Sequence, residues 1–195
     1  IIDFTTATQP AAISITDLDK DGKSDLIINT VNLDGYVSVL RNTSSSGTIS
    51  FAPKTDLQAA GGSIEELRTT DVDGDGKPDL AVACFNGSTV SVFRNTSSVG
   101  SVSLAAKINF APADLPRSVA IGDINGDGKL DIYLCHSGAL LPEKRKNELF
   151  VNQGNDANGI PQFKEMAEEY GIASEATSTS AAFFDYDLDG DLDLF

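Results

Sequence analysis

Four short segments of the sequence carry aspartates at one fixed spacing. They begin at Asp17, Asp71, Asp123 and Asp185, and each follows the nine-residue pattern D-x-[DN]-x-D-G-x-x-D. Ca²⁺ takes six to eight hard oxygen ligands at ~2.3–2.6 Å, which carboxylates, carbonyls and water can supply. The pattern predicts one Ca²⁺ per loop, about four in all, bound by the side chains at positions 1, 3, 5 and 9 and the backbone carbonyl at position 7. The predicted ligands are Asp17, Asp19, Asp21, Lys23 and Asp25; Asp71, Asp73, Asp75, Lys77 and Asp79; Asp123, Asn125, Asp127, Lys129 and Asp131; and Asp185, Asp187, Asp189, Asp191 and Asp193.

The density of negative charge argues that these loops hold a cation. Two carboxylates ~4 Å apart repel by roughly 4 kcal/mol at an effective dielectric constant of 20. Three or four of them in one loop would cost more than a marginally stable domain can offset. Mg²⁺ is disfavoured because it keeps its waters and rarely accepts a cage made wholly of protein atoms. The alternative is four solvated Asp-rich turns without an ion.

Other positions of the loop have their own physical reasons. Gly at position 6 permits the positive φ that turns the chain around the ion, and the apolar residue at position 10 is expected to anchor the next strand. An EF-hand shares the first nine positions but needs Glu at position 12; the sequence has Ile28, Val82 and Leu134 there. Asn125 replaces Asp at position 3 of the third loop, which predicts a weaker site.

The loops are parts of a longer repeat. They recur at spacings of 54, 52 and 62 residues, and residues 37–44 recur almost unchanged as residues 90–97. Within one period, residues 12–16 alternate like a strand, residues 26–28 form a continuous apolar run, residues 37–40 alternate again, and residues 49–54 are expected to form a more polar fourth strand. Four strands per repeat, with the same loop in each, predict an all-β fold, a β-propeller of four-stranded blades.

The repeats divide the chain into about three and a half blades. Their expected bounds are approximately 3–55, 56–108 and 109–170, with a truncated fourth repeat at 171–195, all in one domain. Propellers close with about 4–8 blades, and an open arc exposes sheet edges that proteins usually protect. We therefore expect the chain to be part of a larger propeller, completed by further sequence or by another chain.

Charge and composition exclude several classes of partner. The net charge is −15, which argues against nucleic acid and against anionic membranes as partners, because both require a basic surface. No apolar run reaches the ~18 residues of a membrane-spanning helix. Cys84 and Cys135 follow equivalent loops in neighbouring repeats, too far apart for a disulfide, and are expected to be buried free thiols.

The loops and their period together resemble the FG-GAP/VCBS repeat family, which includes the calcium-loop propeller of integrin α subunits. This resemblance covers essentially the whole chain. It implies that each loop joins the first and second strands of a blade and that one Ca²⁺ stabilises this hairpin. Residues 147–154, 163–172 and 182–195 also resemble the ASPIC/UnbV subgroup, which includes cartilage acidic proteins and implies a secreted, acidic, calcium-binding protein.

Three functions are compatible with these features. The first is an extracellular, non-enzymatic module for adhesion or for binding a protein or glycan ligand, because extracellular Ca²⁺ suits modules with Kd of about 10⁻⁴–10⁻³ M. The second is an accessory or catalytic propeller domain of a secreted polysaccharide-active enzyme; the third is a structural spacer. Catalytic candidates are few: His136 is the single histidine and is expected to pack in a loop after a buried strand. Glu65 and Glu66 are expected to point to opposite faces of a strand.

Overall fold

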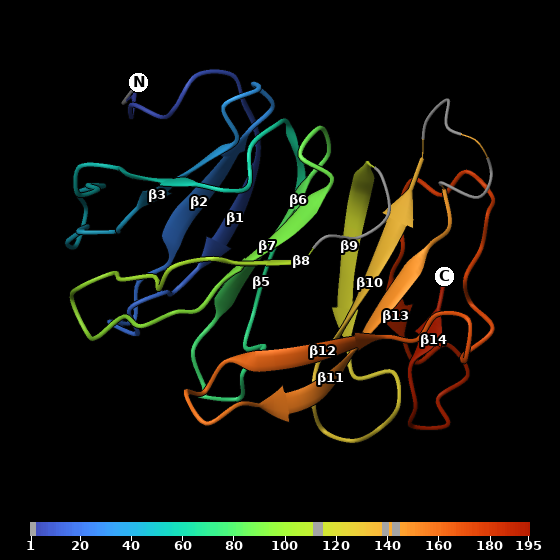
Figure 1. Ribbon diagram of the computed structural model, residues 1–195. Helices are drawn as coiled ribbons and strands as arrows, with labels where there is room; N and C mark the ends of the chain where they lie inside the picture. Colours follow the sequence, from blue (N-terminus) through green and yellow to red (C-terminus); the bar gives the residue numbers. More distant parts are fainter. Residues whose placement is uncertain (1–2, 111–114, 138–140, 142–144) are drawn as a thin grey trace.

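The computed structural model describes residues 3–110, 115–137, 141 and 145–195, and over these residues the chain is all-β (Figure 1). Three four-stranded antiparallel sheets follow one another, and a two-stranded sheet comes last. The first sheet contains β1 (Pro10–Thr16), β2 (Asp25–Thr30), β3 (Tyr36–Leu40) and β4 (Thr55–Gln58). The second contains β5 (Ile64–Thr70), β6 (Asp79–Cys84), β7 (Thr89–Phe93) and β8 (Ile108–Phe110). The third contains β9 (Pro116–Gly122), β10 (Asp131–His136), β11 (Glu148–Asn155) and β12 (Pro161–Glu165), and the last pairs β13 (Phe183–Phe184) with β14 (Asp193–Leu194).

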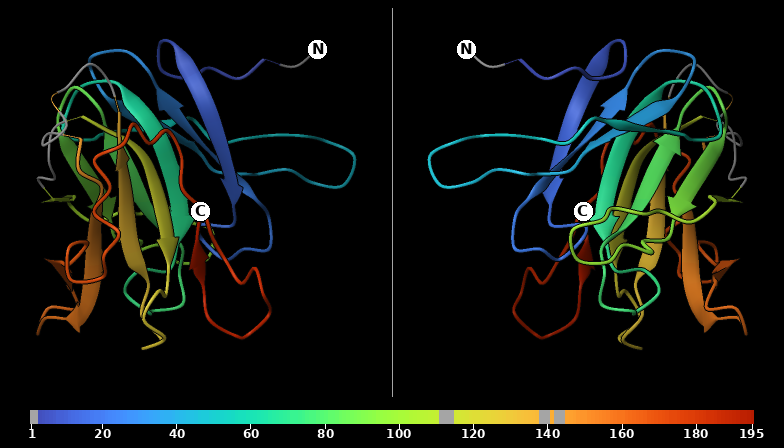
Figure 2. Two further views of the ribbon diagram at one scale, coloured as in Figure 1. Left: turned by 90° about the vertical axis from the view of Figure 1, so that its right-hand side faces the viewer. Right: turned by 90° about the vertical axis from the view of Figure 1, so that its left-hand side faces the viewer.

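The sheets stack face to face as the blades of a partial β-propeller, which confirms the predicted fold class. Strands that follow one another in sequence are neighbours in each sheet. The first strands of successive sheets pack together, β1 with β5, β5 with β9, and β9 with β13. These first strands therefore line the inner side of the arc, and the later strands of each sheet extend outward (Figures 1 and 2).

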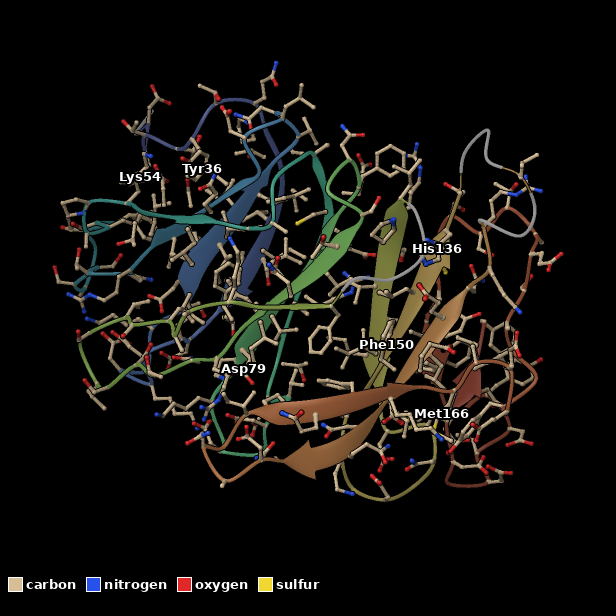
Figure 3. All side chains as sticks on the ribbon, viewed as in Figure 1. Tyr36, Lys54, Asp79, His136, Phe150 and Met166 are labelled. Atoms are coloured by element: carbon tan, nitrogen blue, oxygen red, sulfur yellow. The ribbon has the colours of Figure 1, made fainter. Side chains whose placement is uncertain are left out.

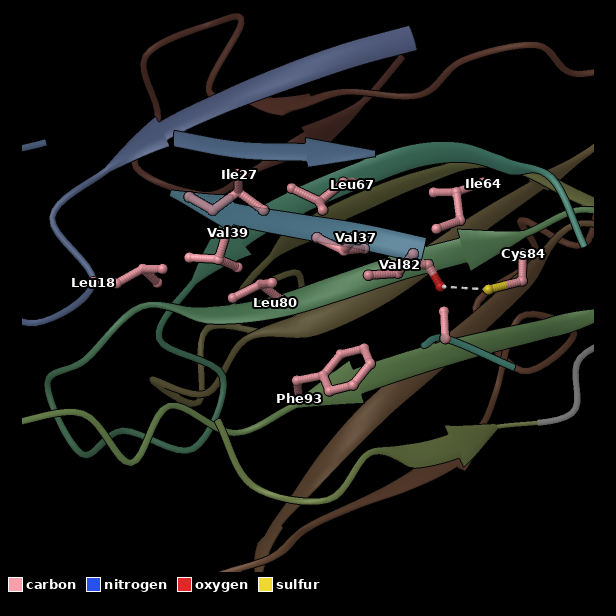
Figure 4. Close-up of a cluster of buried hydrophobic side chains, with 11 residues drawn as sticks. Leu18, Ile27, Val37, Val39, Ile64, Leu67, Leu80, Val82, Cys84 and Phe93 are labelled. Atoms are coloured by element: carbon pink, nitrogen blue, oxygen red, sulfur yellow. Dashed lines mark hydrogen bonds between the residues drawn. The ribbon is translucent and has the colours of Figure 1, made fainter. Parts of the chain in front are cut away.

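Apolar side chains fill the space between neighbouring sheets. Between the first and second sheets, Ile27 and Val39 pack against Leu80 and Val82, all of them buried (Figure 4). Two similar clusters lie between the second and third sheets and between the third and fourth. Because the middle strands are covered on both faces, β6 and β10 are buried along their whole length, which explains the apolar runs at residues 80–84 and 132–135 that follow their opening aspartates.

The fourth strand of the first sheet lies later in the chain than the sequence predicts. Residues 49–54 do not form it; the strand is β4, which pairs with β3. Residues 42–51 instead fold into an arm outside the sheet, held by the bridges Asn42–Phe51 and Ser45–Thr48. After the tight turn at Gly47, where φ is +78°, the returning chain makes only isolated bridges and hydrogen bonds with residues 41–45, and the regular ladder with β3 begins at Thr55.

A β-bulge interrupts the first strand of each four-stranded sheet near its start. The register shifts between Pro10 and Ala12, between Ile64 and Glu66, and opposite the end of β10. Two consecutive residues at a bulge need not point to opposite faces. The alternation expected for Glu65 and Glu66 is therefore wrong: both carboxylates reach β9, where Glu65 meets Arg117 and Glu66 accepts a hydrogen bond from Val119 N, and both residues line one cavity.

Two further expectations concern the cysteines and the membrane. Cys84 and Cys135 are buried free thiols, as predicted. None of the described residues belongs to a helix long and apolar enough to cross a membrane.

Candidate functional site

Each Asp-rich loop connects the first strand of a sheet to the second. Position 9 is always the first residue of the second strand: Asp25 opens β2, Asp79 opens β6, Asp131 opens β10 and Asp193 opens β14. The four loops lie on the same side of the sheets (Figure 1). The antiparallel pairing of the two flanking strands therefore brings both ends of every loop together, so that its first and ninth residues can share one site.

Hydrogen bonds hold the loops in one common conformation. The carboxylate at position 1 accepts a hydrogen bond from the backbone N–H of the glycine at position 6, with N···O distances of 2.9, 2.7, 2.7 and 3.1 Å along the chain. These four glycines have φ between +82° and +100°, which confirms the role predicted for position 6. The backbone at position 4 of each loop is also in the left-handed region, where Lys20 and Leu188 have φ of +57° and +63°. The sequence analysis did not predict this positive φ.

In the first three loops the position-9 carboxylates are buried and are fixed by two backbone N–H groups, whereas Asp193 in the fourth is half-buried and accepts from Tyr186 N. In the second loop Asp79 accepts hydrogen bonds from Val72 N at 3.0 Å and from Asn95 N at 2.7 Å. Asp25 and Asp131 have the equivalent partners. Burial raises the pKa of Asp79 to about 6, and it raises the pKa of Asp25 and Asp131 in the same direction. A nearby cation would favour the ionised form of these carboxyl groups.

The predicted ligand side chains converge in the loops. In the first, second and fourth loops, carboxylate oxygens from positions 1, 3 and 9 all lie within 4.8 Å of one another. In the third loop, Asp127 N donates to both Asp123 Oδ1 and Asn125 Oδ1, at 3.1 and 3.0 Å. The equivalent N–H of Asp21 donates to positions 1 and 3 of the first loop. Asn125 thus keeps the geometry of the aspartate that it replaces.

The position-5 carboxylates take part through one oxygen. Their Oδ1 atoms accept the backbone N–H of position 7 in all four loops, at 2.9–3.2 Å. The oxygens that converge in the first, second and fourth loops come from positions 1, 3 and 9, so a ligand role for position 5 remains a prediction. Coordination of Ca²⁺ by the backbone carbonyl at position 7 remains a prediction for Lys23, Lys77, Lys129 and Asp191.

The surroundings of Asp19 Oδ2 show whether the oxygen ligands of the first loop suit a hard cation such as Ca²⁺. The Asp19 side chain is 0% exposed, and its Oδ2 has no hydrogen-bond partner among the described residues. The Arg41 guanidinium is 3.5 Å away, beyond hydrogen-bond geometry. Buried carboxylates cost several kcal/mol unless positive charge compensates them, and here the single Arg41 guanidinium faces three carboxylates that converge. With carboxylates at positions 1 and 9 beside it, the arrangement fits Ca²⁺.

Two kinds of residue that the sequence analysis missed flank the loops. Arg94 Nε donates to Asp73 Oδ2 at 2.6 Å, and Arg41 Nη1 lies 3.5 Å from Asp19 Oδ2. Asn95, which follows Arg94, donates from Nδ2 to Leu18 O in the preceding repeat at 2.9 Å. The recurrence of the Arg-Asn pair was visible in the sequence, but its contact with the loops was not.

A polar cavity lies away from the loops. It has a volume of about 460 Å³ and is lined by residues from the first strands of the sheets, including Glu65, Glu66, Arg68 and Arg117. Glu66 pairs with Arg68, and Glu65 lies 3.4 Å from Arg117. Because these residues are near the starts of β5 and β9, whereas the loops follow the ends of those strands, the cavity and the loops are on opposite sides of the sheets.

His136 is buried within a sheet. It is the last residue of β10, is 0% exposed, and its Nε2 lies 3.1 Å from Glu148 Oε2. The expectation that it would lie in a loop is wrong, since the strand extends to include it. Figure 3 shows His136 and Asp79 toward opposite sides of the molecule, so the histidine belongs to no Asp-rich loop.

Comparison with known sequences agrees with this architecture. No curated protein matches the chain significantly. The sequence profile of the FG-GAP-like repeat matches residues 17–82 and again residues 71–134. Each match starts at the first residue of one Asp-rich loop and ends within the second strand of the next sheet, and together they span more than half of the chain. The chain therefore belongs to the FG-GAP-like repeat family.

Proposed function

We propose that this chain is an extracellular calcium-binding β-propeller module with a non-enzymatic role in adhesion, ligand binding or scaffolding. The observation that carries the calcium proposal is the convergence of buried and half-buried carboxylate oxygens from positions 1, 3 and 9 in the loops. FG-GAP-like repeats are typically non-catalytic and often bind calcium. Weak sites of this kind would be filled at the ~1 mM Ca²⁺ outside cells and would be empty in the cytosol.

Thermal unfolding with and without chelator tests the calcium proposal. A ligand that binds only the folded state at 100 times its Kd adds about 2.7 kcal/mol per site. We expect the midpoint to fall by many degrees in EDTA, to recover with Ca²⁺ and to recover poorly with Mg²⁺. Asp71→Asn should reduce this response. Asp34→Asn, which changes an exposed aspartate outside the loops, is the matched control and should leave it intact. A melting curve that EDTA does not move would refute the proposal.

The polar cavity is the proposed site for a protein or glycan ligand. Its lining combines carboxylates, guanidinium groups and hydroxyls, which can donate and accept hydrogen bonds. Ser118 Oγ is buried in this lining without a hydrogen-bond partner among the described residues, so a polar ligand group or water could satisfy it. Binding of the calcium-loaded protein to glycan and matrix-protein arrays, with Arg117→Ala as the comparison, tests this role. No binding at all would favour the spacer function.

The same cavity keeps the enzymatic alternative open. Glu65 and Glu66 both line it, although each is engaged in an ion pair with an arginine. Paired carboxyl groups can serve in glycoside cleavage. Release of reducing ends from polysaccharides, abolished by Glu66→Gln, would support an accessory or catalytic domain of a secreted polysaccharide-active enzyme.

We further propose that another sheet of the same kind covers the outer face of the first sheet. Ile13 and Ile15 on this face are 56% and 62% exposed, whereas Val119, at the position of Ile13 in the third repeat, is 0% exposed. Further sequence or another chain could supply the covering sheet. Analytical ultracentrifugation of this chain, with Ile15→Ser as the comparison, tests the second source: self-association that this change abolishes would support it.

The last third of the chain carries the resemblance to the ASPIC/UnbV subgroup. The family match ends at residue 134, so this finer assignment rests on residues 147–154, 163–172 and 182–195. It adds support for a secreted, acidic protein that binds calcium.

A further inference from the structure

The three complete sheets differ at one position beside the loop. Arg41 follows β3 and Arg94 follows β7, whereas Val151 occupies the equivalent place inside β11, as the strand registers show. Arg94 Nε is 2.6 Å from Asp73 Oδ2, and Arg41 is 3.5 Å from Asp19 Oδ2. Both arginines therefore contact the carboxylate at position 3 of their own loop. The third loop has Asn125 at position 3 and has no arginine at this position.

The two differences compensate each other in charge. The first and second loops each contain four ligand aspartates, one lysine at position 7 and the adjacent arginine. The third contains three ligand aspartates and one lysine at position 7. The second and third sites therefore carry the same formal net charge of −2, although their ligand sets differ, and one Ca²⁺ would neutralise each of them. The first loop also contains Lys20 at position 4, which brings its formal net charge to −1.

Arg94 is held in place by more than one contact. Its guanidinium lies beside the turn between β11 and β12, where a Cβ added to Gly159 would be 3.3 Å from Nη2. The same charge contributes to the lowered pKa of Asp156 in that turn, although hydrogen bonds from backbone N–H groups are the larger cause. The Asp73 side chain is 1% exposed and that of Arg94 is 23% exposed, so the pair is only partly screened by solvent.

We propose that Arg41 and Arg94 lower the calcium affinity of the first two sites by offsetting the position-3 carboxylate, so that the second site matches the third. This inference rests on the proposed calcium function. A fixed positive charge touching a ligand carboxylate weakens the attraction of that carboxylate for a divalent cation. Even at a water-like dielectric constant, the repulsion between a unit charge and a doubly charged ion a few ångströms apart corresponds to about a tenfold change in affinity. Asn125 therefore does not make the third site the weakest, because the charge that it lacks is cancelled in the other two.

Hydrogen–deuterium exchange during a calcium titration tests this inference site by site. Peptides that cover residues 71–80 report the second loop, and peptides that cover residues 123–132 are an internal control in the same molecule. Arg94→Met should lower the calcium midpoint of the second loop about tenfold and leave the third unchanged. Arg94→Lys retains the charge and should leave both midpoints within about threefold of wild type.

A double-mutant cycle separates charge from simple positioning. Asp73→Asn should raise the midpoint of the second loop, and Asp73→Asn combined with Arg94→Met, which recreates the polar set of the third loop, should return it to near the wild-type value. If Arg94→Met weakens calcium protection or leaves it unchanged, the charge inference is wrong. If calcium protects none of the four loops in the wild type, it is the proposed function that fails.

A second arginine variant tests the same inference if Arg94→Met does not fold. Arg41→Met makes the same change in the first loop and should lower the midpoint of peptides that cover residues 17–26. Native circular dichroism at saturating Ca²⁺ qualifies each variant for the comparison. A lower midpoint in both arginine variants would support the inference, and its absence in folded variants would overturn it.

Discussion

Replacing Asn95 with alanine should destabilise the protein far more than the same change at Asn42, although both residues follow an arginine at the end of the third strand. Asn95 is 2% exposed, and its Nδ2 donates to Leu18 O and to Pro78 O, both at 2.9 Å. Its Oδ1 accepts Ser97 N at 2.9 Å. One side chain therefore ties the third strand of the second sheet to the loop of the first sheet, which precedes it by 77 residues.

The size of the effect follows from the groups left without partners. Asn95→Ala removes the donor from two carbonyl oxygens at a buried position, and each unsatisfied buried group costs about 1–3 kcal/mol. We expect a loss of about 3 kcal/mol in the free energy of unfolding. The Nδ2 of Asn42 donates to Ser24 O, at 2.8 Å in an exposed setting. Water can replace that bond, so Asn42→Ala should cost about 1 kcal/mol or less.

Urea denaturation in saturating Ca²⁺ measures both changes. The two variants should share the wild-type m-value and differ in midpoint, because the same surface is exposed on unfolding. Equal losses for the two variants would refute the idea that this asparagine links neighbouring sheets. Asn152→Ala offers a second case, because its Nδ2 reaches Val72 O of the preceding repeat at 3.1 Å.

Three further outcomes are expected. Burial raises the pKa of Asp79 to about 6, above its unfolded value of about 3.9. The stabilisation from its protonation is therefore present below about pH 4 and is lost as pH rises through about 6. Melting midpoints measured in EDTA should fall over this range, and the fall should be smaller in Asp79→Asn. Gly62→Ala should cost more than about 2 kcal/mol in the free energy of unfolding, because a Cβ there would lie 2.6 Å from a backbone nitrogen that cannot easily move; Gly47→Ala, with a similar positive φ and open space, should cost about 1 kcal/mol. Leu134→Ala should cost about 2–5 kcal/mol in urea denaturation, because Leu134 is fully buried between two sheets, whereas Leu33→Ala, at a side chain that is 74% exposed, should cost almost nothing.

The sequence was sufficient for the parts of this protein that depend on residues close together in the chain. The nine-residue loop rule located every Asp-rich turn, and the positive φ at Gly22, Gly76, Gly128 and Gly190 follows from it. Local patterns also located the first three strands of the first repeat. They failed for the fourth strand, because the sequence of residues 49–54 does not show that a turn at Gly47 carries them away from the sheet.

Only the tertiary structure decided which distant residues meet. The bulge in β5 places Glu65 and Glu66 in one cavity, although a regular strand would separate them. The stacking of the sheets brings Asn95 to the first loop and Arg94 to the turn near Gly159. Nine consecutive residues determine the type and spacing of the predicted Ca²⁺ ligands, whereas the charge balance around these ligands depends on contacts between strands and sheets. The sequence alone therefore predicts which cation these loops suit, and the fold determines the surroundings that set how tightly they would bind it.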